Sequence, residues 1–160
     1  MMRIRIVAVG KIKERYLAEG IKEFTKRLAP FCRLDISEIA EERMLENSSA
    51  LEKAKTLARE GERILKAVRP GSYLFVLDVD AGQLASEGLA AKLDALALAG
   101  KSDITFIIGG AFGLAPEVRA AANERLSFSK LTFTHQMIRL LLVEQVYRAF
   151  KISRGEPYHW

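Results

Sequence analysis

Two stretches of the sequence decide the fold. The first reads Tyr73-Leu74-Phe75-Val76-Leu77-Asp78-Val79-Asp80, and the second reads Ile104-Thr105-Phe106-Ile107-Ile108-Gly109-Gly110-Ala111-Phe112-Gly113. Each begins as a nearly continuous apolar run of strand length, which is typical of a strand buried on both faces of a parallel sheet. Each then breaks into carboxylates or glycines, which favour turns. The turns after these strands are therefore the first places to look for function.

Helical patterns lie between strand patterns along the rest of the chain. Ser49 and Glu52 have the spacing of a capping box, Ser86 is a predicted N-cap, and Pro116 suits a first helical turn. Strands joined through helices predict a three-layer α/β fold with a parallel-rich sheet, formed by one domain over 1–160. The predicted strands are 3–9, 33–39, 73–77, 104–108 and 128–133, and the predicted helices are about 14–28, 50–68, 87–99, 116–122 and 136–153.

Positive charge is concentrated at the beginning of the chain. The protein has 25 Lys and Arg against 20 Asp and Glu, and residues 1–33 hold nine basic and three acidic residues. A basic region of this kind attracts polyanions such as RNA, although a solvated helix face gives the same count. The candidate RNA contacts are Lys11, Lys13, Arg15 and Lys22.

Cysteine and histidine are scarce. Cys32 is the only cysteine and there are two histidines, so we expect neither an intrachain disulfide nor a zinc cluster, and we predict metal-free chemistry. The absence of disulfides favours the cytoplasm. The apolar run 4–9 is too short for a signal peptide core, so we expect no membrane partner.

The turns after the central strands have more than one interpretation. The glycines at 109, 110 and 113 match neither the dinucleotide nor the phosphate-loop spacing, so a structural turn and a ligand loop remain equally open. Asp78 and Asp80 have the residue type of metal ligands or acid/base groups, but a solvated turn is favoured. His135 is interpreted as a capping or core histidine.

The last helix is apolar on more than one side, which favours burial against a second subunit. Glu144 and Arg148 stand four residues apart, so an intrahelical ion pair and a site role for Arg148 are both open. Chain ends normally fray, and a terminus carrying Tyr158, His159 and Trp160 indicates a docked, working segment.

Taken together, these segments resemble a known family over essentially the whole chain. The segments are Val7-Ala8-Val9-Gly10-Lys11, Leu77-Asp78, Ile108-Gly109-Gly110, 126–133, His135-Gln136-Met137-Ile138-Arg139, Tyr147-Arg148-Ala149-Phe150 and Pro157-Tyr158-His159. The chain is similar to the small bacterial SPOUT-class methyltransferases that methylate N3 of a pseudouridine in 23S ribosomal RNA of the large subunit. One departure is Thr134, where relatives often have proline.

The resemblance implies a C-terminal trefoil knot, a homodimer and S-adenosylmethionine as cofactor, with the assembled ribosome as substrate. A knot is an exception to the usual rules of topology. Carried over position by position, the cofactor contacts fall on Leu77, Gly109, Phe128, Ser129, Lys130, Leu131, Thr132 and Phe133.

The resemblance also implies that the tail reaches the cofactor of the partner subunit. The hypothesis for catalysis is that His159 assists deprotonation of N3, Tyr158 positions the base and Arg148 stabilises negative charge on a base carbonyl. Trp160 could stack on a base and is given no catalytic role.

Two other functions stay open at this point. One is a non-catalytic ribosome- or RNA-binding factor that retains the fold, since folds host more than one function. The other is methylation of transfer RNA, which the short chain and the type of terminal motif disfavour.

Overall fold

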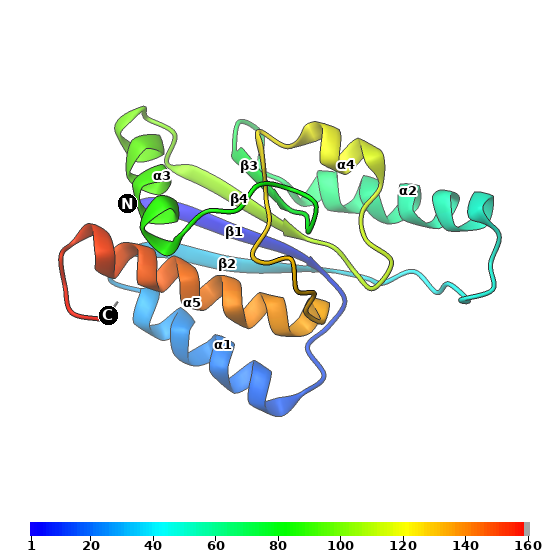
Figure 1. The fold of residues 1–160 in the computed structure, drawn as a ribbon, viewed down its shortest axis with the longest axis horizontal. Coiled ribbons are helices and arrows are strands. Elements are labelled where there is room, and N and C mark those ends of the chain that lie inside the picture. Colours follow the sequence, from blue (N-terminus) through cyan, green and yellow to red (C-terminus); the bar gives the residue numbers. More distant parts are fainter. Residues whose placement is uncertain (159–160) are drawn as a thin grey trace.

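The computed structural model describes residues 1–158 and consists of one parallel sheet covered by helices on both faces (Figure 1). The sheet has the order β2-β1-β4-β3-β5, and all neighbouring strands are parallel. This confirms the α/β class and the parallel sheet. In chain order the elements are β1 (Met2–Val9), α1 (Arg15–Leu28), β2 (Cys32–Ile39), α2 (Ala50–Ala67), β3 (Tyr73–Leu77), α3 (Ser86–Leu98), β4 (Asp103–Ile108), α4 (Pro116–Ala121), β5 (Glu124–Leu126) and α5 (His135–Ser153).

Alternation along β1 divides the core into two layers. Ile4, Ile6 and Ala8 belong to one buried cluster, whereas Val7 and Val9 belong to the other. Successive side chains of a strand point to opposite faces, so the central strand supports both layers. Helix α5 packs against α1 and α3 on one face, while α2 packs against α4 on the other (Figure 1).

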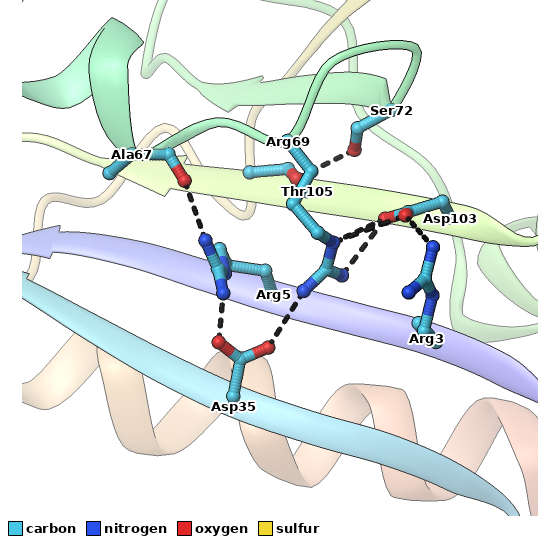
Figure 2. A network of polar contacts seen from close by, with 8 residues as sticks. All are labelled: Arg3, Arg5, Asp35, Ala67, Arg69, Ser72, Asp103 and Thr105. Carbon is cyan, nitrogen blue, oxygen red and sulfur yellow. Dashed lines mark hydrogen bonds and ion pairs between the residues drawn. The ribbon is translucent and has the colours of Figure 1, made fainter.

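Charged pairs join the strands at the end of the sheet where β1 begins. Arg3 pairs with Asp103 across β1 and β4 at 2.7 Å, and Arg5 pairs with Asp35 across β1 and β2 at 2.8 Å. Figure 2 shows Arg69 between the two carboxylates, with ion pairs of 3.1 Å to Asp35 and 2.8 Å to Asp103. Arg3 and Arg5, two of the basic residues in 1–33, therefore neutralise carboxylates within the protein.

Two of the helix caps expected from the sequence can be compared directly with the structure. Ser49 caps α2 by accepting a hydrogen bond from the backbone N–H of Glu52 at 3.1 Å, as predicted. Ser86 was wrongly predicted as a cap: it is the first residue of α3, Ala85 occupies the N-cap position, and the Ser86 hydroxyl donates to Gln145 on α5.

The prediction of a last strand over residues 128–133 is also wrong. The strand next to β3 is the three-residue β5, and residues 128–133 follow it as an irregular segment. Asn123 determines where the pairing starts, because its side chain accepts from Leu74 N–H at 2.8 Å while its own N–H donates to the Leu74 carbonyl at 2.9 Å. Beyond β5, the Ser129 hydroxyl accepts a hydrogen bond from the backbone N–H of Leu131, which forms a local turn. This segment carries six of the cofactor contacts implied by the resemblance.

Candidate functional site

A cavity of about 1000 Å³ opens where the parallel strands end. Ligands of open α/β sheets bind at this edge, because the loops that leave the strands converge there. Its walls come from the ends of β3 and β4, the segment between β5 and α5, and the first turns of α1 and α5. The lining residues that were expected to contact the cofactor are Leu77, Gly109, Phe128, Ser129, Leu131, Thr132 and Phe133. Lys130 lies in the same segment but is not among the lining residues.

Gly109 has a steric reason to be glycine. A Cβ atom at this position would lie 2.8 Å from Leu114 Cγ and 3.0 Å from the Gly113 carbonyl oxygen. Both distances are shorter than a normal van der Waals contact, so the turn after β4 can close only without a side chain. The turn is tightly packed, as a structural turn requires, and it also lines the cavity, so a role as a ligand loop stays a prediction.

Asp78 is buried, which corrects the prediction of a solvated turn. Its side chain is 4% exposed and accepts from Arg125 Nη1 at 3.1 Å, with Arg119 Nε at 3.6 Å. It also accepts from the backbone N–H of Asp80 at 3.1 Å, whereas Asp80 itself is exposed. A buried carboxylate normally has charged partners, and here two arginines from distant parts of the chain supply them.

The first turn of α5 connects the cavity to the loop after β1. Thr134 caps the helix by accepting from Met137 N–H at 3.1 Å, so His135 does not cap it and instead lines the cavity. One turn further, Arg139 is fully buried and donates to Glu38 at 2.7 Å and to the Gly10 carbonyl at 3.0 Å. Arg139 thereby fixes α5 against the end of β1. Sequence reasoning gave it no role, although a charge flanked by apolar residues in a helix is a usable signal for buried pairing.

Arg148 and Tyr158 form a separate cluster around Glu144. Arg148 donates to Glu144 Oε1 from Nε at 3.1 Å and from Nη2 at 2.5 Å, so the intrahelical pair, one of the two roles left open for Arg148, is present. Tyr158 donates its hydroxyl to the same oxygen at 3.0 Å, and the Arg148 guanidinium lies 4.9 Å from the Tyr158 ring centroid. Burial, together with the neighbouring Glu144 carboxylate, raises the pKa of Tyr158 and keeps its hydroxyl protonated.

The structure does not bring this cluster to the cavity of its own chain. Neither Arg148 nor Tyr158 lines the cavity, and His159 and Trp160 lie outside the described residues. Arg148 is thirteen residues beyond His135 on one helix, which separates the two by roughly 20 Å along the axis. Figure 1 shows residues 154–158 at the opposite end of α5 from the helix start.

Within residues 1–158 there is no group of three or more His, Cys, Asp or Glu residues placed to hold a metal ion. No helix in this part of the chain is long and apolar enough to cross a membrane.

A parallel sheet with a large cavity at its strand ends and a glycine turn in the cavity wall has the architecture in which open α/β proteins bind their ligands. The chain belongs to the SPOUT methyltransferase family, because residues 2–159 match the family model described as "Predicted SPOUT methyltransferase". The family resemblance found in the sequence is thereby confirmed.

Curated relatives match over nearly their whole length. A protein of Desulforamulus reducens named "Ribosomal RNA large subunit methyltransferase H" is 52% identical over 159 residues, which are 99% of each chain. The protein of the same name from Halothermothrix orenii is 54% identical over 158 residues, again 99% of each chain. Among solved structures, a "probable methylase family protein" from Haemophilus influenzae Rd KW20 superposes with a TM-score of 0.54 at 15% identity, covering 99% of this chain and 70% of that one. That likeness supports the fold alone.

Proposed function

We propose that this protein transfers a methyl group from S-adenosylmethionine to N3 of a pseudouridine in large-subunit ribosomal RNA, acting on the assembled ribosome in the cytoplasm. The observation that carries the proposal is the identity of about half of all residues to ribosomal RNA large subunit methyltransferases, over 99% of both chains. The proposal includes a single domain over 1–160, a C-terminal trefoil knot and a homodimer, as the sequence resemblance implies.

The cavity suits the cofactor in size and chemistry. A volume of about 1000 Å³ lies at the upper end of the range for small-molecule sites. Leu77, Phe128 and Phe133 supply apolar walls, and Gly109 leaves the backbone accessible at the end of β4. The remaining proposed contacts, Ser129, Lys130, Leu131 and Thr132, come from the irregular segment before α5. When bound, S-adenosylmethionine would supply an electrophilic methyl group on a sulfonium, from which a neutral thioether leaves readily.

The chain must therefore activate the acceptor and orient it. N3 of pseudouridine is a weakly acidic imide nitrogen, and losing its proton makes it nucleophilic. In the proposal His159 assists that loss, Tyr158 positions the base, and the Arg148 guanidinium stabilises the negative charge that develops on a base carbonyl. Glu144 holds Arg148 and Tyr158 in place, since its carboxylate accepts a hydrogen bond from each. Excluding water and fixing the approach of the two reactants supply the rest of the rate enhancement.

The roughly 20 Å between cavity and cluster along α5 supports a site built from two chains. If the tail of one subunit completes the cavity of the other, each chain of a homodimer contributes to both sites. A monomer would then bind cofactor and transfer nothing.

The test of the activity is transfer of a labelled methyl group to purified ribosomes that lack the modification, followed by nucleoside mass spectrometry. We expect N3-methylpseudouridine with the parent protein and at least a tenfold loss with Arg148→Ala or His159→Ala. Arg63→Ala is the control, because Arg63 also pairs with a glutamate, at 3.0 Å from Glu42, and lies on α2, on the face of the sheet away from α5. Ribosome and cofactor binding without methyl transfer would instead favour the non-catalytic binding factor.

The shared site is tested by mixing two inactive variants. Thr132→Trp places an indole at the cavity wall, and Arg148→Ala removes the guanidinium of the cluster. If the sites are shared between chains, a heterodimer of the two has one site with both defects and one site with neither, and activity returns. If they are not shared, each site carries one defect and the heterodimer stays inactive. Absence of recovery in verified heterodimers would assign cavity and cluster to the same chain.

A further inference from the structure

Arg119 is a cation at the cavity wall for which the sequence suggested no role. It lies on α4, lines the cavity and has a side chain that is 44% exposed. Among the described residues that line the cavity it is the sole Lys or Arg, whereas Glu14 and Asp78 contribute carboxylates. Lys130, the basic residue among the proposed cofactor contacts, is not among the lining residues, so within residues 1–158 Arg119 is the Lys or Arg side chain that an anionic group meets on these walls.

Asp78 does not need Arg119 for its own charge balance. Arg125 donates to Asp78 at 3.1 Å and the backbone N–H of Asp80 donates at 3.1 Å, while Arg119 Nε stands further away at 3.6 Å. One carboxylate flanked by two guanidinium groups leaves a surplus positive charge. The buried acid therefore holds Arg119 in place without consuming its terminal nitrogens.

The position of the guanidinium points to the turn after β4. A Cβ atom at Gly113 would lie 3.8 Å from Arg119 Nη2, which places this nitrogen beside the turn that begins at Gly109. Within residues 1–158, neither Nη nitrogen of Arg119 makes a hydrogen bond. Two donors at the wall of a ligand cavity are thus available to an anionic group, in the fork geometry that suits a carboxylate.

We propose that Arg119 binds the carboxylate of the methionine part of S-adenosylmethionine. The inference rests on the proposed function, which supplies the cofactor. The cofactor carries a sulfonium, an ammonium and a single carboxylate, and only the carboxylate gains from a nearby guanidinium. Arg119 is accordingly a binding residue for the donor end of the cofactor and takes no part in proton removal.

The test compares two cofactors that differ in one group. Isothermal titration calorimetry gives the Kd of S-adenosylmethionine and of decarboxylated S-adenosylmethionine, which keeps the sulfonium and the ammonium. We expect Arg119→Ala to weaken binding of the complete cofactor about tenfold, a modest value because the side chain is partly exposed. Binding of the decarboxylated form should stay within about twofold of the parent protein, and Arg119→Lys should restore part of the loss.

Arg125→Ala is the matched control. Arg125 pairs with the same Asp78 oxygen and has a similar exposure of 50%, but it does not line the cavity. Because the surplus charge beside Asp78 depends on both arginines, Arg125→Ala should also weaken the complete cofactor, but by less than Arg119→Ala, which removes the proposed contact itself. Added salt should narrow the tenfold difference in Arg119→Ala, because a partly exposed ion pair is screened.

The outcomes separate this inference from the proposed function. If the parent protein binds S-adenosylmethionine and Arg119→Ala weakens both cofactors equally, or neither, Arg119 only supports the wall and the inference is overturned. If the parent protein binds neither cofactor at millimolar concentration, the proposed function fails and the inference falls with it. A loss confined to the complete cofactor, without loss of the folded state in the far-ultraviolet circular dichroism spectrum, supports both.

Discussion

The substitution Gly109→Ala tests the account of the turn after β4. The added methyl group would lie 2.8 Å from Leu114 Cγ, whereas carbon atoms pack best at about 3.5–4.0 Å, so one side must move by roughly 1 Å. Leu114 is buried, and the second contact, 3.0 Å to the Gly113 carbonyl oxygen, involves backbone. Overpacking of this kind costs about 1–3 kcal/mol, and we expect Gly109→Ala to lower the free energy of unfolding by that amount.

Urea denaturation measures the loss, and two further variants show its origin. Gly82→Ala is the matched control, since a Cβ atom there meets nothing within 4 Å and its backbone needs no positive φ. This control should leave the unfolding free energy unchanged or raise it by about 0.4–1 kcal/mol. Leu114→Ala alone should cost about 2–5 kcal/mol, and adding it to Gly109→Ala should cost less than the sum of the two, because the truncated side chain leaves room for the methyl group.

The reasoning is refuted if Gly109→Ala and Leu114→Ala are additive, or if Gly109→Ala is as stable as Gly82→Ala. Cofactor affinity provides an independent measurement. Because the turn also lines the cavity, a shift of about 1 Å should weaken binding of S-adenosylmethionine in Gly109→Ala and leave it unchanged in Gly82→Ala.

Two further predictions concern charged groups away from the cavity. Burial raises the pKa of Glu60 in the folded state, so the stability that Glu60 contributes is fully present below its ordinary pKa and is lost as pH rises through the raised folded value. Glu60→Gln should therefore be more stable than the parent protein at pH 7. Urea denaturation from pH 4 to 8 should show this difference in unfolding free energy vanish at the acid end. Arg69→Met removes the ion pairs to Asp35 and Asp103, so it should lower the unfolding free energy by about 1–2 kcal/mol. Cofactor affinity should stay unchanged, because these pairs lie at the end of the strands away from the cavity. An altered Kd for S-adenosylmethionine would contradict that separation.

The parts of the fold that could be predicted from sequence are those determined by local pattern. β3 spans Tyr73–Leu77, which is the predicted range, because an unbroken apolar run has one stable place in a parallel sheet. The last strand could not be predicted in this way. Its pairing with β3 begins at hydrogen bonds between Asn123 and Leu74, forty-nine residues apart, and no local pattern records that partner.

The candidate site shows the same division. The turn at Gly109 was identified from its glycines, but the burial of Asp78 was not, since the sequence around it looks like an ordinary polar turn. Its partners Arg119 and Arg125 follow the turn at Gly109 in the sequence, whereas Asp78 precedes that turn. Neither arginine carries a local signal that it pairs with Asp78. Burial of a charge depends on where its counter-charges come from, so composition predicts it poorly when the partners are distant in sequence.

One stripe of α5 explains how two distant groups could serve one reaction. Met137, Leu141, Glu144 and Arg148 follow each other at helical spacing and are all only half-buried in the single chain. The stripe is apolar near the cavity and charged near the tail. In the proposed homodimer, two such helices packed antiparallel along this stripe would cover the apolar half and place the Arg148 of each chain beside the start of the other's α5. The 20 Å that separates cluster and cavity along one helix is then the distance that an antiparallel pair closes.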